Sequence, residues 1–336
     1  MSKQQIHRTV DGERIAGVAR PVFLRNGDLH LVHIGIYADG LIDCWGLLTL
    51  EEFAADVRRG RIVTRFEEGA RASVFETVQW DFGRVRSSVL TPESLIAEVR
   101  DDIDRLNGRP DATERAWRAV HAFRVEPTEE RRAVLRAAYE QIPEHERHAA
   151  LADHSVGDGP LYDLAMGVGP GVTADQYRES LAYFDEEWGD ARACLARFEQ
   201  APEPEVHPTA VLAPWPPASG PPEPPGLAVL RNEWPAPIRV GEVVYASVSE
   251  AWAALDPPAE ARTAVMAALL RAKYGSHPEL AAALTGTGTA RIHWQPQWAD
   301  ADASFWGCEA DGRNWMGRLL ELVRGELHLK RLNLPL

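Results

Sequence analysis

The stretch PVFLRNGDLHLVHIGIYADGLIDCWGLLT, residues 21–49, decides the fold class of the first part of the chain. Apolar and polar residues alternate along it, which is typical of half-buried β-strands. Turn-forming residues interrupt the alternation at NGD, residues 26–28, and at ADG, residues 38–40. We therefore predict an antiparallel meander here, and a further strand pair over residues 61–81.

Helix signals follow the meander. Thr49 is a predicted N-cap, and Thr91 with Pro92 marks a second helix start. Apolar residues at three- and four-residue spacing predict a helix pair over residues 112–152 and one long helix over residues 173–199. The chain is thus predicted to be α+β, with a mixed antiparallel sheet followed by a helical connector.

A proline-rich segment divides the chain. Ten of the 24 residues from 202 to 225 are proline, which favours an extended, semi-rigid spacer. The predicted organisation is an α+β N-terminal domain over 1–110, a helical connector over 111–201, a linker over 202–226 and a C-terminal module over 227–336.

Charge excludes one broad class of function. The formal net charge is −14, which does not fit a protein that coats nucleic acid non-specifically. Residues 227–336 carry 11 Lys and Arg against 12 Asp and Glu, so a local phosphate-binding site there is compatible with the composition.

Apolar run length and cysteine content predict where in the cell the protein is found. No apolar run reaches the roughly 18 residues needed to span a bilayer, and we expect no membrane partner. Cys44, Cys194 and Cys308 are too few and too widely spaced for a disulfide framework or a metal motif. We predict a cytoplasmic protein with reduced thiols, and the oligomeric state stays open.

One group in the N-terminal part suggests a metal site. His30, His33, Asp39, Asp43 and Cys44 lie close together in sequence. On an alternating strand the two histidines face opposite sides, and the set lacks a known ligand spacing. We therefore predict no metal at these residues.

Four segments of the last third carry a family resemblance. They are LRNEWPAPI from Leu230, VYASVSEAW from Val244, LLRAKYGSHPEL with a later Thr-Gly from Leu269, and FWGCEADGRNWMGRLLELVR from Phe305. In order and spacing they resemble the NADAR family of N-glycosidases that act on ADP-ribose and related nucleotides. Upstream, residues 36–53 resemble an uncharacterised domain found before NADAR modules in actinobacterial proteins, which implies no activity.

The resemblance implies a mainly α-helical module that hydrolyses the ribose–base bond of ADP-ribosyl or nucleotide substrates. The implied partner is an ADP-ribose-type nucleotide or ADP-ribosylated guanine, including guanine in nucleic acid. Hydrolysis of this kind uses no metal and no redox cofactor. A carboxylate near the anomeric carbon would stabilise the positive charge that develops there.

Three departures from the family pattern bear on catalysis. The family glutamate is replaced by Ser249, and Glu250 follows it; on a helix this changes the direction by about 100°. The segment before Ala264 is shortened. The family aspartate position holds Ala303, and Asp302 lies one residue earlier.

The candidate site follows from the motifs. The turn at residues 311–314 feeds a helix whose unpaired N–H groups, beside Arg313 and Arg318, suit a phosphate; the alternative is that Asn314 only caps that helix. Lys273 is expected to be buried or directed at a phosphate. The predicted catalytic residues are Glu250 and Asp302. The predicted substrate-binding residues are Asn232, Tyr245, Lys273, Trp306, Gly307, Asn314 and Arg318.

Three functions of different classes remain. The first is an N-glycosidase, which the resemblance favours. The second is an ADP-ribose- or NAD-binding sensor that has lost its catalytic carboxylate, which Ser249 favours. The third is a purely structural interaction protein, which the acidic N-terminal part suggests and the Trp306–Arg318 segment disfavours. Ligand binding separates the third from the other two, and turnover separates the first from the second.

Overall fold

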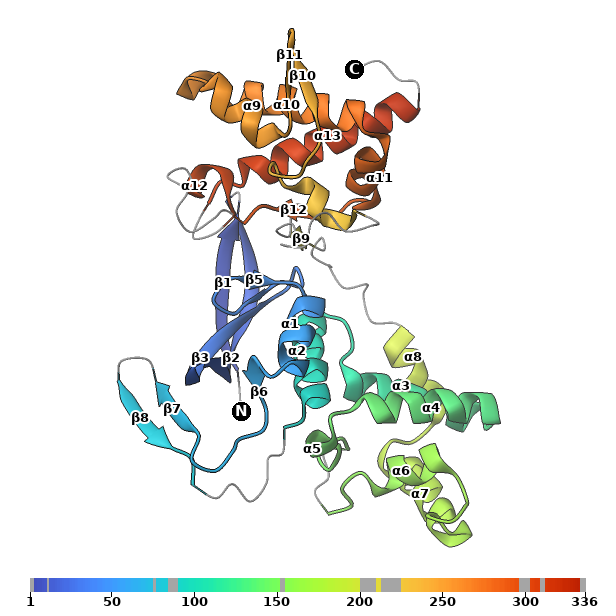
Figure 1. Ribbon diagram of the computed structural model, residues 1–336. Helices are drawn as coiled ribbons and strands as arrows, with labels where there is room; N and C mark the ends of the chain where they lie inside the picture. Colours follow the sequence, from blue (N-terminus) through green and yellow to red (C-terminus); the bar gives the residue numbers. More distant parts are fainter. Residues whose placement is uncertain are drawn as a thin grey trace. The chain divides into compact units, whose positions relative to one another are not determined.

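The computed structural model describes residues 3–10, 12–74, 77–83, 90–151, 155–199, 210–212, 225–295, 303–308 and 312–332. They form two compact units (Figure 1). Unit 1 comprises residues 1–5, 17–38 and 42–207, and unit 2 comprises residues 6–16, 39–41 and 208–336. Sheet and helices together make the fold α+β, as predicted.

The strands are β1 (Gln4–Val10), β2 (Glu13–Asn26), β3 (Asp28–Tyr37), β4 (Ile42–Asp43), β5 (Leu47–Leu48), β6 (Ile62–Val63), β7 (Arg71–Val74), β8 (Val78–Asp81), β9 (Ala210–Leu212), β10 (Ile238–Val240), β11 (Val243–Tyr245) and β12 (Arg291–His293).

The helices of the first part are α1 (Leu50–Arg58), α2 (Pro92–Leu106), α3 (Ala112–Val125), α4 (Glu129–Gln141), α5 (Glu144–Arg147), α6 (Gly159–Met166), α7 (Ala174–Glu187) and α8 (Ala191–Glu199). Those of the second part are α9 (Val248–Leu255), α10 (Arg262–Ser276), α11 (Pro278–Gly286), α12 (Ala303–Trp306) and α13 (Trp315–Arg331), with 3-10 turns η1 (Gly226–Leu230) and η2 (Ala259–Ala261).

The predicted meander is confirmed in unit 1. β2 and β3 pair antiparallel from Gly17↔Tyr37 to Asn26↔Asp28, and Gly27 supplies the positive φ of 73° that the tight turn needs. β4 then pairs antiparallel with β3. The predicted strand pair further on is also present, as β7 and β8, and β7 lies parallel to β3.

α1 and α2 cover one face of this sheet. Alternate residues of β2 and β3, such as Val22 and Ile34, are buried against Phe53 of α1 and Val99 of α2. Both predicted caps are confirmed, because Thr49 accepts from the backbone N–H of Glu52 and Thr91 accepts from that of Ser94.

A helical layer with its own core completes unit 1. α3 and α4 pack together as the predicted pair, and Thr128 caps α4. The single helix predicted over residues 173–199 is wrong. α7 ends before Trp188, and Gly189 adopts a positive φ of 70°, so α8 starts afresh.

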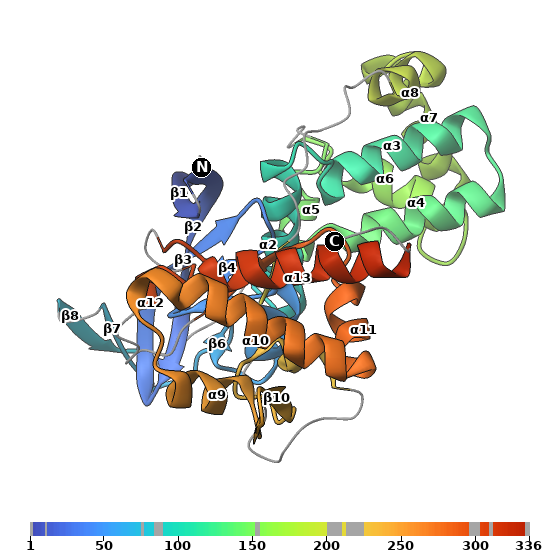
Figure 2. The same ribbon diagram turned by 90° about the horizontal axis from the view of Figure 1, so that it is seen from above.

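Unit 2 is mainly helical, as predicted for the C-terminal module. α10 and α13 run side by side over a shared apolar core that also takes in η1, α9 and α11 (Figure 2). β10 and β11 form a small antiparallel hairpin. β12 pairs parallel with β9, so three residues of the predicted spacer form a strand instead.

The remaining residues of the predicted spacer lie largely outside the described part of the chain. Within the described residues, no helix has both the length and the apolar character that crossing a membrane requires.

Candidate functional site

Asn232 lies in the core of unit 2, directly after η1. Its side chain is buried, and its amide nitrogen is 3.8 Å from the sulfur atoms of both Met266 and Met316. Its backbone carbonyl accepts a hydrogen bond from the N–H of Ser249 at 3.1 Å. Asn232 therefore ties the segment after η1 to the first turn of α9.

Lys273 is a buried cation of this unit. The side chain on α10 is fully buried, and its ammonium donates to the carbonyls of Val229 and, at 2.8 Å, Arg231. Burial lowers the pKa of Lys273 to about 7, and Glu233 opposes that change weakly. Of the two predicted roles, the structure shows the buried one, since the ammonium binds the carbonyls at the end of η1.

The start of α9 positions the predicted catalytic carboxylate. Ser247 is the N-cap and its hydroxyl accepts from the N–H of Glu250 at 3.2 Å. The exposed Glu250 carboxylate in turn accepts from the N–H of Ala246. Glu250 thus completes the hydrogen bonding of a helix start. Ser249, where the resemblance expects a glutamate, is half-buried, as is Tyr245.

Four half-buried aromatic side chains meet where α9, α12 and α13 come together. We call Trp252, Phe305, Trp306 and Trp315 the aromatic cluster. The Trp252 and Trp306 rings meet edge to face at 5.4 Å, and Phe305 meets Trp306 at 4.8 Å and stacks on Trp315 at 6.0 Å. The Arg318 guanidinium lies 5.1 Å from the Trp315 ring centroid. Flat π-faces beside a cation suit a nucleobase or a nicotinamide-like ring.

Asn314 precedes α13 in the left-handed conformation, with φ 48°. Its buried side chain donates to the carbonyl of Ile292 at 2.9 Å and accepts from the N–H of Trp294 at 3.0 Å. The predicted side-chain cap is therefore wrong, because the amide holds β12 instead. Its backbone N–H donates to the carbonyl of Gly307, which is also buried.

The first turn of α13 follows the turn for which a phosphate site was predicted. Among the described residues no side chain caps it, and the turn itself contains no acidic residue, so its first N–H groups and its positive dipole end suit an anion. Arg313 is exposed just before it and Arg318 is half-buried within it. Asp302, the second predicted catalytic residue, lies outside the described residues, as does Asp311.

Unit 2 also contains a buried charged group, formed by Arg8, Asp39 and His293, that was not predicted from the sequence. The Arg8 guanidinium bonds the Asp39 carboxylate and lies 3.2 Å from Nδ1 of His293 on β12. Burial, and then the charge of Arg8, lowers the pKa of His293 to about 3, so the imidazole is neutral. Because 285 residues separate Arg8 from His293, no local pattern pointed to this contact.

His30 and His33 lie on β3, and Asp43 lies on β4 next to Cys44. Nδ1 of His30 lies 2.9 Å from the Ser73 hydroxyl, and burial raises the pKa of the Cys44 thiol to about 11. Within the described part of the chain, His30, His33, Asp39, Asp43 and Cys44 do not converge as a metal-binding group.

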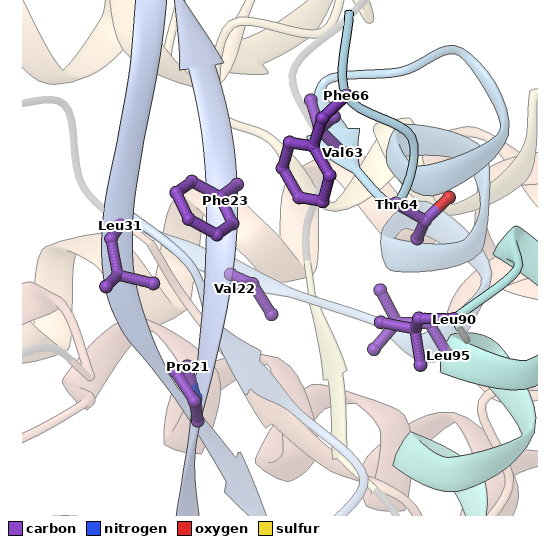
Figure 3. Close-up of a pocket in the computed structure, with 9 residues that line it drawn as sticks. All are labelled: Pro21, Val22, Phe23, Leu31, Val63, Thr64, Phe66, Leu90 and Leu95. Atoms are coloured by element: carbon purple, nitrogen blue, oxygen red, sulfur yellow. The ribbon is translucent and has the colours of Figure 1, made fainter. Parts of the chain in front are cut away.

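Unit 1 contains a pocket of different character. Its volume is about 220 Å³, and its lining is apolar except for Thr64. Figure 3 shows Phe23 and Phe66 on one side and Leu90 and Leu95 on the other. The two phenylalanine rings meet edge to face at 4.9 Å. Such a lining suits a small apolar group and not a phosphate.

Comparison with known proteins gives two family models and one solved structure. Residues 5–110 match a domain of unknown function (DUF7638), and residues 111–194 match a second domain of unknown function (DUF7639). No curated protein matches significantly. The NMR structure of the E. coli protein YbiA is similar, with 20% sequence identity, 38% of this chain and 89% of that chain covered, and a TM-score of 0.29.

Proposed function

We propose that residues 227–336 bind an ADP-ribose-type nucleotide at the aromatic cluster and the first turn of α13, and that this module reports the nucleotide without cleaving it. The observation that carries the proposal is the adjacency of Phe305, Trp306 and Trp315 to a helix start that lacks both a capping side chain and an acidic residue. A ring would stack on the aromatic cluster, and a phosphate would accept from the N–H groups of α13.

Two cations support the phosphate position. Arg318 lies over Trp315 in the first turn, and Arg313 precedes that turn. A guanidinium beside backbone N–H groups adds charge-assisted hydrogen bonds to a diphosphate.

The helix start at α9 favours binding over hydrolysis. Glu250 bonds the N–H of Ala246 and faces solvent, and the residue at the family glutamate position is a serine. A carboxylate engaged in this way differs from the partly buried general acid or base that glycoside cleavage uses.

N-glycosidase activity on ADP-ribosylated guanine is the second candidate. The observation that favours it is the exposure of the Glu250 carboxylate at a helix N-terminus, where a substrate can reach it. The reaction would then take place at Glu250 together with Asp302. A cytoplasmic location accompanies either candidate as part of the proposal.

Titration calorimetry of the full chain with ADP-ribose, followed by assay of the protein for release of ADP-ribose from ADP-ribosylated guanosine, tests both. We expect binding without release, and about tenfold weaker binding in Arg318→Gln. Arg239→Gln makes the same charge change on the exposed face of β10 and should bind like the parent.

Release of ADP-ribose that Glu250→Gln abolishes would replace the sensor with the glycosidase. Absence of ADP-ribose binding by the parent protein would overturn the sensor, and absence of both binding and release would overturn both candidates. Equal weakening in Arg318→Gln and Arg239→Gln would show that the site does not lie at α13.

A further inference from the structure

Three potential ligands meet in unit 1, between α2 and α5. Glu98 comes from the middle of α2, and His145 and Glu146 come from the four-residue helix α5. One ligand atom from each lies within 4.8 Å of the other two. These residues lie in the segments matched by different domains of unknown function, Glu98 in 5–110 and the other two in 111–194.

Glu98 provides a second and independent observation. Its side chain is only 6% exposed, and one carboxylate oxygen, Oε2, bonds the Arg20 guanidinium. The other oxygen, Oε1, makes no hydrogen bond with the described residues, although it lies 2.9 Å from Nε2 of His145. A buried carboxylate oxygen without a hydrogen bond is unfavourable unless a further group satisfies it.

The short distance without hydrogen-bond geometry fits two ligands that share one ion. Zinc binds histidine nitrogen and carboxylate oxygen at about 2.0–2.2 Å and prefers tetrahedral geometry, so two such ligand atoms lie about 3.4 Å apart. Oε1 and Nε2 lie 2.9 Å apart, so a small outward movement of the partly exposed His145 side chain would admit the ion. A histidine among carboxylates favours a zinc-type ion over calcium or magnesium, which take oxygen ligands.

We propose that Glu98, His145 and Glu146 bind one zinc-type divalent cation, with water completing the coordination. The side chain of His145 is 25% exposed, so an ion and its water reach the group from solvent. Arg20 holds Oε2 of Glu98 and thereby orients Oε1, which is the role of the groups that surround metal ligands.

The local charge attracts a cation. Two carboxylates against one guanidinium leave a net negative charge at the group. The ion would fasten α5 to α2 and so join the two matched segments of unit 1.

Zinc titration of the tag-free full chain, freed of metal by chelation, tests the site. We expect one equivalent of zinc to bind and to raise the melting temperature. His145→Gln and Glu146→Gln each remove one ligand from half-buried or exposed positions and should weaken zinc binding at least about tenfold. Glu98→Gln should also weaken zinc binding. Because this change disturbs the ion pair with Arg20 as well, its zinc affinity is compared only if the variant is folded.

Glu144→Gln is the matched control, because Glu144 is exposed on the same helix α5 and lies outside the ligand group. Its zinc affinity should equal that of the parent. Absence of zinc binding by the parent protein would overturn the proposal, as would unchanged affinity in His145→Gln and Glu146→Gln.

Discussion

At the scale of single residues, Lys273 shows how burial changes chemistry. An ammonium group in solution has a pKa near 10.5, and burial among apolar side chains lowers the pKa of Lys273 to about 7. The two carbonyls that it binds, of Val229 and Arg231, keep it in place. Its charge state is therefore linked to the stability of unit 2.

The sign of that linkage is a testable prediction. Between pH 7 and 10.5 the unfolded chain holds the Lys273 proton and the folded chain releases it, so the contribution of Lys273 to the free energy of unfolding rises with pH across this range. Lys273→Met removes the titration. We expect the difference in unfolding free energy, parent minus variant, to grow by up to about 1.4 kcal/mol per pH unit.

Urea unfolding at pH 7, 8 and 9, followed by tryptophan fluorescence, measures this difference. Other titrating groups are common to both proteins and cancel. A difference that stays constant across this range would show that Lys273 keeps its proton on folding.

At the scale of elements, helix caps and turns that depend on neighbouring residues were predicted correctly. Contacts between residues far apart in the sequence were not. The caps at Thr49 and Thr91 and the turn at Gly27 were predicted, because each depends on neighbours three residues away or fewer. The amide of Asn314 was predicted as a cap, yet it bonds Ile292 and Trp294 on a strand that adjoins it only after folding.

In the candidate site, too, some features could be predicted from motifs and others depend on the folded structure. The motifs indicated Trp306 and Arg318, and the ring contacts of Phe305 and Trp315 connect the two. Their spacing could not show that Glu250 completes a helix start, since the outcome depends on where α9 begins.

The packing of α13 on β12 gives a prediction with an internal control. A Cβ atom at Gly317 would lie 1.9 Å from the carbonyl oxygen of Ile292, whereas one at Gly325 would meet nothing within 4 Å. Gly317→Ala should therefore destabilise the protein by about 3 kcal/mol. Gly325→Ala should stabilise it by roughly 0.5–1 kcal/mol, because alanine favours helix.

Thermal and urea unfolding of Gly317→Ala, Gly325→Ala and the parent protein measures these differences in stability. Equal stability of Gly317→Ala and the parent would mean that α13 does not approach β12 this closely.

At the scale of the whole molecule, the compact units do not follow the order of the chain. Residues 6–16 and 39–41 fold with residues 208–336. The proline-rich boundary suggested that the C-terminal part is autonomous, and composition gave no sign of an N-terminal contribution to it. The contact between Arg8, Asp39 and His293 is invisible in sequence because only the fold brings these residues together.

Asp39→Asn tests this shared unit. The change leaves the Arg8 charge without its carboxylate partner in a buried place, and removing one partner of such a pair typically costs about 3 kcal/mol. We expect faster amide hydrogen exchange along β12 and α13, and unchanged exchange in α4 and α6 of unit 1.

Glu13→Gln is a suitable control, because it breaks the Glu13–Arg291 ion pair, in which the Glu13 side chain is 69% exposed. It should change exchange little. Equal exchange along β12 in the parent and in Asp39→Asn would show that unit 2 holds together without Asp39.

The sequence separation of Arg8 and His293 also determines how long translation takes to bring both residues into existence. A ribosome that adds about 5–20 residues per second needs roughly 15–60 s to pass from one to the other. During that interval β1 has emerged and can meet β2 and Asp39, but the residues of 208–336 that complete unit 2 do not yet exist. Residues 6–16 therefore reach their complete native surroundings only after synthesis of β12, long after they themselves have emerged.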